Sequence, residues 1–395
     1  RLVATGYVPD FGDDIPETVT DETLNGLVFL GVMVFTDPVR PGVRDAISGV
    51  QSAGARVLLV TGDNPETALS IAQQVGIATP QETALTGADV EELSDAELLM
   101  AMAHTHVYAR VVPKQKLRIA EVLQQAGEIV AMTGDGINDA PALQRANIGV
   151  ATGSGTQVAQ AASDLVLMRD SFATMYAAIE EGRRIVSNLR KVIGYLLSTS
   201  FSEIALIMTA LVLGSAAPIT AVQILWANII EEGLMSVAFA FEPGEKGAMR
   251  RRPQDIHEEG ILSTSMLGFL ALVVVVLSCF TVGLYLYLRS LDLSDEMLRS
   301  AMFLSVAADS LFIAFAFRSL TVPIWRISLF ANRFFIGSFC LSCVLLFGTL
   351  SIPFMREVLS YTPLPGSLVV LVFGVSAAGL LMVEVAKWVF FERRG

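Results

Sequence analysis

The chain has 395 residues, 53% of which are hydrophobic, and a mean hydropathy of +0.58, so it is too apolar for an ordinary soluble enzyme. Its net charge of −12 comes without a basic stripe and disfavours a nucleic-acid partner. The apolar residues gather beyond about Gly182, which divides the sequence into an α/β-like part and a part dominated by long apolar spans.

The first part alternates short apolar strands with helix starts. Apolar runs bounded by turn residues predict strands at 26–35, 56–60, 107–110, 128–132 and 165–168. Helices are predicted near Pro41, at 66–75 and at 113–125, each next to a proline. This alternation predicts a parallel, right-handed, doubly wound sheet, in which we expect the strand 26–35 to be buried.

Polar residues follow several of these strands. Asp37 follows the first strand, Thr61-Gly62-Asp63 follows the second, and Asp135 follows the strand 128–132. Because the carboxyl ends of parallel strands meet at one edge of a sheet, we expect these carboxylates to lie close together. A phosphate near Thr61 would meet the positive end of the helix 66–75. Lys116 is expected to point at the same edge, with an ordinary surface lysine as the alternative.

The segment 133–141, Thr-Gly-Asp-Gly-Ile-Asn-Asp-Ala-Pro, is the most informative in the chain. It predicts a tight turn that carries Asp135, Asn138 and Asp139 and leads into a helix start. Hard oxygen ligands at the edge of such a sheet suit Mg²⁺ together with a phosphate. The alternative is a loop in which the Asp and Asn side chains only cap the helix.

This segment resembles the hinge motif of P-type ATPases, the cation pumps that pass through an aspartyl-phosphate, and Asp37-Pro38-Val39-Arg40 resembles a second motif of that family. The resemblance implies an α/β haloacid-dehalogenase-like phosphorylation domain with a Rossmann-type parallel sheet, and Mg²⁺ and ATP as cofactors. The catalytic residues that it implies are Thr61, Gly62, Asp63, Lys116, Asp135, Asn138 and Asp139, with Asp135 and Asp139 as Mg²⁺ ligands. The implied ATP-binding residues are Arg1, Asp37 and Arg40.

The family's fold also needs a nucleophilic aspartate on its first strand, within an Asp-Lys-Thr-Gly-Thr run that does not occur in this sequence. We therefore expect the nucleophile to lie upstream of Arg1 and the chain alone to be inactive. On the family pattern, residues 1–25 end a nucleotide-binding domain, 26–182 form the C-terminal part of the phosphorylation domain, and 183–395 form the transmembrane domain. The expected partner is the N-terminal half, with the actuator domain, the nucleotide-binding domain and the first four helices.

Six stretches of the second part are long and apolar enough to cross a lipid bilayer. They are 192–214, 219–241, 266–288, 301–317, 334–352 and 367–390, and together they predict an all-α six-helix transmembrane domain. Arginine and lysine gather in alternate connecting segments, so the positive-inside rule places the α/β part in the cytoplasm of a multi-pass protein, which we expect in the plasma membrane. Cys279, Cys340 and Cys343 lie in these spans and are interpreted as packing residues, with redox or metal use as the alternative.

Ionisable residues inside such spans are costly and usually functional. The polar residues singled out in the spans are Glu203, Asn228, Glu231, Glu232 and Asp309. Asn228, Glu231 and Glu232 are spaced by three and four positions, so they are expected to share one helix face. A hydrogen-bonded packing residue is the alternative for each one, but five such groups in three spans favour a shared ion site. Glu384, near the end of the last span, is expected to be interfacial.

The family comparison bears on the ion. Glu203, Asn228 and Glu232 match ion-binding positions of calcium pumps, whereas Glu231 replaces a threonine and Asp309 only falls near an acidic position of the family. Such a cluster suits a cation that needs six to eight hard oxygens, and its lack of Cys and His argues against Cu⁺ or Zn²⁺. We expect ATP-driven export of Ca²⁺, with a Na⁺ or K⁺ pump as the alternative. A membrane-anchored phosphatase and a non-catalytic assembly fragment are the remaining hypotheses, and the carboxylates disfavour the former because an anchor has no use for buried charge.

Overall fold

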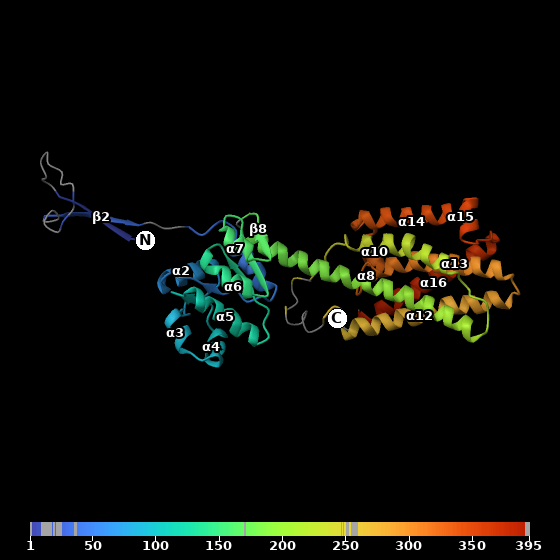
Figure 1. Cartoon of the computed structure of the whole chain (residues 1–395), viewed down its shortest axis with the longest axis horizontal. Helices are drawn as coiled ribbons and strands as arrows, with labels where there is room; N and C mark the ends of the chain where they lie inside the picture. The colour runs from blue at the N-terminus through green and yellow to red at the C-terminus, as the bar shows by residue number, and fades with distance from the viewer. Residues whose placement is uncertain are drawn as a thin grey trace. The chain divides into compact units, whose positions relative to one another are not determined.

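The computed structural model describes residues 2–8, 18, 20, 26–34, 38–169, 171–245, 247, 249, 253 and 260–391 (Figure 1). Contacts divide the chain into two compact units. The first comprises residues 1–48 and 57–174, and the second comprises residues 49–56 and 175–395. This division falls close to the composition shift near Gly182 that the sequence predicts.

The first two strands form a hairpin-like pair. Strand β1 (Leu2–Tyr7) pairs antiparallel with β2 (Val28–Val34), with an irregularity between Thr5 and Gly6. The expectation that the run 26–35 is a buried strand of the parallel sheet is wrong for the residues described here, because six of the seven residues of β2 are exposed. An apolar run indicates a strand but not its partner, and a two-stranded ribbon by itself covers neither of its faces.

The other strands of the first unit form two three-stranded sheets in which every pairing is parallel. The first sheet has the order β3-β5-β4 and the second has the order β6-β7-β8. Their bounds are Leu59–Val60 for β3, Leu85–Thr86 for β4, Val107–Ala109 for β5, Ala131–Gly134 for β6, Ile148–Thr152 for β7 and Leu165–Leu167 for β8. The central strand β5 is fully buried, as a strand covered on both faces should be.

Seven helices among the described residues belong to this α/β part. They are α1 (Val43–Ser52), α2 (Pro65–Val75), α3 (Gly87–Glu92), α4 (Asp95–Met102), α5 (Pro113–Gln125), α6 (Ala140–Arg145) and α7 (Gln157–Ala161). Asn64 caps α2 by accepting the Thr67 amide at 2.8 Å, and Gly76 ends it at a φ of 82°, where a residue without a Cβ is favoured. Thr86 and Ser94 begin α3 and α4 with capping boxes.

The second unit is a bundle of long helices. They are α8 (Phe172–Val212), α9 (Ala221–Ala227), a π-helical turn (Asn228–Glu232), α10 (Gly233–Phe239), α12 (Thr264–Ser290), α13 (Asp295–Phe317), α14 (Arg333–Ser351), α15 (Pro353–Val358) and α16 (Gly366–Phe391), with short 3₁₀ turns at Ile324–Arg326 and Leu329–Ala331. Five of these, namely α8, α12, α13, α14 and α16, are long and apolar enough to cross a membrane. Within the described residues the predicted span 219–241 is not one of these five; there Ala221–Phe239 forms α9, the π-helical turn and α10 in direct succession, so a change of helix type rather than a loop interrupts it.

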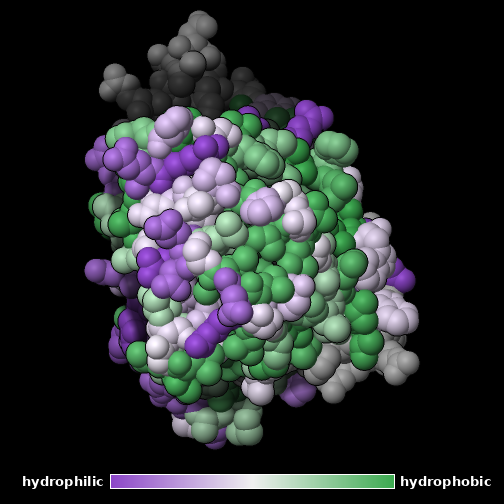
Figure 2. All heavy atoms as spheres, turned by 90° about the vertical axis from the view of Figure 1, so that its right-hand side faces the viewer, coloured by the Kyte–Doolittle hydropathy of each residue, from purple (hydrophilic) through white to green (hydrophobic). Residues whose placement is uncertain are grey.

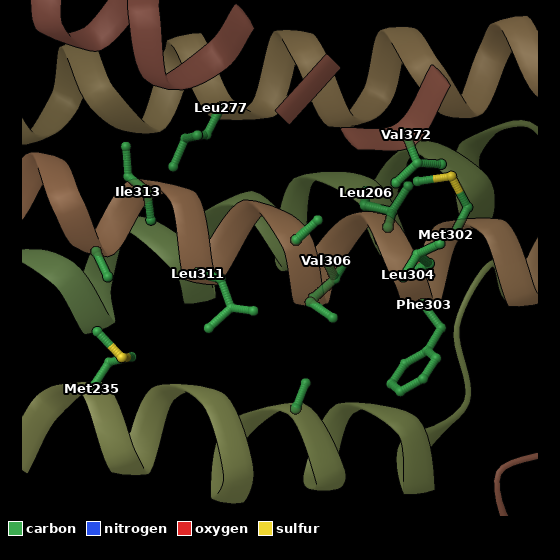
Figure 3. Packing of buried hydrophobic residues seen from close by; sticks show 14 of the residues in the cluster. Leu206, Met235, Leu277, Met302, Phe303, Leu304, Val306, Leu311, Ile313 and Val372 are labelled. Atoms are coloured by element: carbon green, nitrogen blue, oxygen red, sulfur yellow. The ribbon is translucent and has the colours of Figure 1, made fainter. Parts of the chain in front are cut away.

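Helix α13 lies at the centre of the bundle. It packs against α12, α14 and α16, and its membrane-length window is 83% buried. Figure 3 shows α13 side chains such as Leu311 and Ile313 reaching between Met235 of α10 and Leu277 of α12. The core of the bundle is therefore organised around this helix.

The outer surface of the bundle is apolar. Leu211, Val212, Val344 and Val370 are between 66% and 80% exposed. Figure 2 looks at the end of the bundle that lies on the right in Figure 1, where hydrophobic and polar side chains are mixed. Apolar surface of this extent marks contact with another apolar phase, and with helices of this length that phase is a lipid bilayer.

Candidate functional site

The loop after β6 is built around Asp139. The strand ends at Gly134, a 3₁₀ turn covers Ile137–Asp139, and α6 follows at once. Asp139 is 8% exposed, and its Oδ2 accepts the Gly136 amide at 3.3 Å. A Cβ on Gly134 would lie 2.5 Å from the Cβ of Asp139, so the loop can close over this carboxylate only because residue 134 is glycine.

Lys116 completes this arrangement from α5. Its Nζ donates to Asp139 Oδ1 at 2.7 Å, and the two side chains are 16% and 11% exposed. Both oxygens of Asp139 therefore have a partner. The carboxylate is placed to hold Lys116, and its role as a Mg²⁺ ligand stays a prediction.

Asp135 differs from Asp139 in its surroundings. Its side chain is exposed, and no described residue donates a hydrogen bond or forms an ion pair with its carboxylate, while its main-chain oxygen accepts the Thr156 amide at 2.8 Å. A fixed backbone with a free carboxylate at the end of a strand suits Mg²⁺, which protein sites commonly hold through one or two carboxylates together with phosphate and water. Asn138, also predicted, is exposed beside it.

The loop after β3 closes on itself. The Thr61 amide donates to the Tyr108 carbonyl of β5 at 2.9 Å, the Thr61 hydroxyl donates to Asp63 Oδ2 at 3.0 Å, and the Asp63 amide donates back to Thr61 Oγ1 at 3.1 Å. Gly62 is exposed between them. Within the described residues no hydrogen bond joins this loop to Asp135 or Lys116, and the joint catalytic role of these residues stays a prediction. Of the predicted ATP-binding residues, Arg40 is exposed, and Arg1 and Asp37 lie outside the described residues.

Two of the predicted ion ligands lie together inside the bundle. Glu203 of α8 is 8% exposed and Glu232, at the end of the π-helical turn, is 4% exposed. The two carboxylates are close enough to interact electrostatically. In the described part of the chain, Oε1 of each is buried and has no hydrogen-bond partner. Leaving a buried carboxylate oxygen unpaired is costly, so this pair is the strongest sign of a ligand site in the bundle.

Asp309 occupies a separate, hydroxyl-lined environment on α13. Its Oδ2 accepts the Thr281 hydroxyl of α12 at 3.0 Å and the Ser305 hydroxyl at 3.5 Å. Thr281 in turn lies 3.4 Å from the hydroxyl of Ser202 on α8. The sequence analysis did not single out these hydroxyls, although Ser305 stands four positions before Asp309, the spacing that places two residues on one helix face.

The predicted shared site of five groups stays a prediction, because the described residues show only part of it. Asn228 is exposed while Glu232 is buried, so these two do not share one environment, and the side chain of Glu231 lies outside the described residues. A step of four residues still turns a side chain by about 40° around an α-helix, and the π-helical turn changes that step further. No group of three or more His, Cys, Asp or Glu in the described chain is placed to hold a metal ion.

Two buried ion pairs in the bundle were not predicted. Glu384 is wholly buried rather than interfacial, and it accepts both Lys387 Nζ and the Ile324 amide at 2.7 Å. Glu242, 3% exposed, is paired with Arg318 at 2.9 Å. The i, i+3 spacing of Glu384 and Lys387 is a signal from which their ion pair could have been predicted. Glu242 and Arg318 lie 76 positions apart, so the sequence gives no such signal for their pair.

Comparison with known proteins finds two families, one matching most of the first compact unit of the chain and one matching within the second. A family described as haloacid dehalogenase-like hydrolase matches residues 10–147, and one described as the C-terminus of cation transporting ATPases matches residues 216–389. A probable cation-transporting ATPase F of Mycobacterium tuberculosis is 38% identical over 97% of this chain and 43% of its own length. A calcium-transporting ATPase of Listeria monocytogenes is 33% identical over 98% of this chain and 43% of its own length. One of Bacillus subtilis is 39% identical over 67% of this chain and 30% of its own length. The chain thus spans less than half the length of these curated relatives.

Proposed function

Because this chain belongs to the cation-transporting P-type ATPase family, we propose that it supplies the C-terminal part of the phosphorylation domain and six membrane-spanning segments of an ATP-driven cation pump. The aspartate that receives the phosphoryl group lies outside this chain in the proposal. The chain then contributes the residues that orient and stabilise the transferred group, and those that bind the cargo.

In the α/β unit, the proposal gives Lys116 the task of stabilising negative charge on the transferred phosphoryl group. Asp139 keeps this lysine in place through the 2.7 Å ion pair, and Gly134 beside it allows the close approach. Asp135 is the proposed Mg²⁺ ligand, because its carboxylate is exposed and unpaired within the described chain. Bound there, Mg²⁺ would neutralise phosphate charge. Thr61 contributes its hydroxyl once its bond to Asp63 is released.

In the bundle, Glu203 and Glu232 are the proposed core of the transport site. The observation that carries this proposal is that each has a buried oxygen with no partner in the described structure and that the two carboxylates are close enough to interact electrostatically. Two neighbouring carboxylates remain buried at lower cost when a cation lies between them. Asp309 is held by hydroxyls instead, so we assign it a supporting position.

For the cargo we propose Ca²⁺. Two carboxylates provide the charge of −2 that matches a divalent cation, and Ca²⁺ accepts the flexible sets of hard oxygens that helices and main-chain carbonyls offer. Two of the relatives above are named calcium-transporting ATPases, which supports the same choice. A pump for Na⁺ or K⁺ is the alternative. The remaining part of the proposal places the α/β unit on the cytoplasmic side of the plasma membrane, on the strength of the arginine-rich connecting segments.

The test is the formation of phosphoenzyme from ATP by the complete pump, measured against the concentrations of Ca²⁺, Na⁺ and K⁺. Glu203→Gln and Glu232→Gln should each raise the half-activating Ca²⁺ concentration by at least about tenfold, since each removes a ligand charge. Glu357→Gln, on the exposed face of α15, is the matched control and should leave it unchanged. Activation by Na⁺ or K⁺ without micromolar Ca²⁺ would overturn the calcium assignment, and an unchanged ion dependence in both variants would remove Glu203 and Glu232 from the site.

A further inference from the structure

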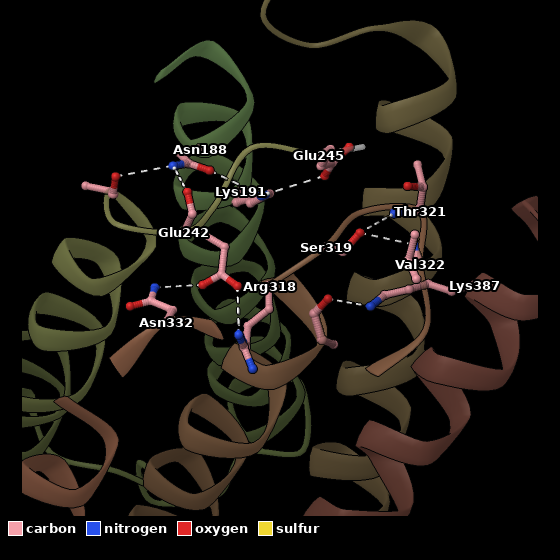
Figure 4. A network of polar contacts seen from close by, with 12 residues as sticks. Asn188, Lys191, Glu242, Glu245, Arg318, Ser319, Thr321, Val322, Asn332 and Lys387 are labelled. Atoms are coloured by element: carbon pink, nitrogen blue, oxygen red, sulfur yellow. Dashed lines mark hydrogen bonds and ion pairs between the residues drawn. The ribbon is translucent and has the colours of Figure 1, made fainter. Parts of the chain in front are cut away.

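A buried amide ties the end of α10 to α8. Asn188 of α8 is 3% exposed, and its Nδ2 donates to the carbonyls of Ala240 at 3.2 Å and Glu242 at 2.9 Å, as Figure 4 shows. These carbonyls follow the last turn of α10, where helix carbonyls lack partners within the helix. Lys191, one turn along α8, donates to Asn188 Oδ1 at 3.2 Å and so orients the amide. The C-terminal end of α10 is therefore bound by a side chain of α8 rather than by solvent.

The same segment is anchored from two further elements. The Glu242 carboxylate accepts Arg318 at 2.9 and 3.1 Å and Asn332 at 2.7 Å. Arg318 follows α13 and is 1% exposed, and Asn332 caps α14 and also donates to the Ala238 carbonyl at 3.0 Å. Replacing such a buried ion pair by apolar residues often costs no stability, so we infer that this pair serves to fix one geometry. Four helices are thereby held in one register at this end of the bundle.

We propose that Asn188, with the cluster of Glu242, Arg318 and Asn332, is a positioning residue that sets the axial register of α8 against α10 and thereby the separation of the Glu203 and Glu232 carboxylates. Asn188 lies 15 residues before Glu203, about 22 Å along α8, so it does not touch the ion. Glu232 lies eight residues before Ala240, about 12 Å along α10. The inference rests on the proposed function, in which these two carboxylates bind the cargo.

The π-helical turn explains why an outside reference is needed. A π-helical turn bonds residue i to i+5, so its rotation and rise differ from those of an α-helix, and the turn at Asn228–Glu232 separates α9 from α10. The position of Glu232 along the helix axis is then set by α10 and by the side chains that hold the C-terminal end of α10, Asn188 among them. Ca²⁺ ligands must lie within 2.3–2.6 Å of the ion, so a sliding error of about 1 Å between α8 and α10 would spoil the site.

The test uses the complete pump and measures the half-activating Ca²⁺ concentration separately from the maximal phosphoenzyme level. Asn188→Leu keeps the shape of the side chain and removes both donated hydrogen bonds. It should raise the half-activating concentration about tenfold, the equivalent of one lost hydrogen bond, and leave the maximal level unchanged. The double variant Glu242→Met with Arg318→Met fills the space of the buried ion pair with apolar atoms. It should raise the half-activating Ca²⁺ concentration by the same factor, so the proposal can still be tested if Asn188→Leu does not fold.

The matched control is Gln223→Met. Gln223 is also a fully buried amide that donates to a carbonyl, that of Leu359 at 2.8 Å, but it lies on α9 beyond the π-helical turn. Its loss should lower thermal stability without changing the half-activating concentration. An equal shift in this control, or a fall in only the maximal level for Asn188→Leu, would show that Asn188 merely stabilises the bundle and would overturn the proposal.

A direct distance measurement separates this inference from the proposed function. Spin labels at Met208 on α8 and Val237 on α10, which are 50% and 55% exposed, would report the register in a variant without the native cysteines. Asn188→Leu should shift or broaden the distance distribution between them, and an unchanged distribution would refute the register claim. If Glu203→Gln and Glu232→Gln leave the ion dependence intact while the distribution still broadens, the ion assignment fails and the positioning of α8 against α10 stands.

Discussion

Replacing Gly134 by alanine should open the loop around Asp139, whereas the same change two residues later should not. A Cβ at position 134 would lie 2.5 Å from Asp139 Cβ and 2.8 Å from its Cγ and Oδ2, while a Cβ at Gly136 would come no nearer than 3.7 Å to any atom of Asp139. Carbon atoms in contact prefer 3.5–4.0 Å, so Asp139 must move by about 1 Å in Gly134→Ala. A shift of that size lengthens the 2.7 Å ion pair with Lys116 beyond hydrogen-bond range.

The cost of such overpacking is about 1–3 kcal/mol, which corresponds to about 5- to 150-fold faster local opening. Hydrogen exchange followed by mass spectrometry on the complete protein measures this directly in the peptides that cover β6 and α6. Gly134→Ala should exchange faster there by that factor and should form phosphoenzyme slowly, and Gly136→Ala should match the wild type in both. Equal exchange in the two variants would refute the view that Gly134 is needed for the closure over Asp139.

Three further predictions concern Asp135, the Glu242–Arg318 ion pair and Asp89. Asp135→Asn should block phosphorylation from ATP and leave local hydrogen exchange unchanged, because its carboxylate is exposed. Asp139→Asn should block phosphorylation and also speed hydrogen exchange in the loop, by the equivalent of about 1–3 kcal/mol. If Asp135→Asn speeds exchange and Asp139→Asn does not, the roles of the two residues must be exchanged. Arg318→Met should lower the melting temperature in detergent, since it leaves a buried charge at a cost of about 3–5 kcal/mol, and adding Glu242→Met should restore most of it. Hydrogen bonds from the Thr86 side chain and amide at the start of α3 lower the pKa of Asp89 below its ordinary value of 3.8, so its stabilising effect is present above that pH and is lost as the pH falls through the lowered value. The stability difference between wild type and Asp89→Asn should therefore narrow below pH 3.8, and a constant difference would contradict this.

Much of the α/β unit could be predicted from local signals. The helix from Pro113 to Gln125 has the predicted bounds, and the segment 133–141 forms the predicted turn and helix start. Helices α3 and α4 were not predicted, although the capping pairs Thr86 with Asp89 and Ser94 with Glu97 are readable in the sequence. The error at β2 has another cause, because hydrophobicity indicates a strand but leaves open which partner covers it.

In the bundle, the length and composition of the apolar stretches located the helices, but they did not predict which polar residues lie close together. Hydropathy located the helical stretch within 219–241, yet it carries no information on the π-helical turn that orients Glu232. The grouping of Glu203 with Glu232, and of Asp309 with Thr281, depends on how α8, α12 and α13 pack, which sequence spacing within one helix does not determine. The roles of these residues, like those of Thr61 and Lys116, remain predictions until the variants are measured.

The π-helical turn also affects how sequences of this kind should be aligned. A turn that closes from residue i to i+5 is an α-helix that has taken in one additional residue, so five residues from Asn228 to Glu232 stand where a regular helix would need four. Deleting one residue here would be absorbed locally, with α9 and α10 continuing as a single regular helix. The side chains on the two flanks would keep their relative register, whereas those within Asn228–Glu232, Glu232 included, would change direction. An alignment that places a one-residue gap in this stretch thus describes a different ion site, even when all flanking residues match.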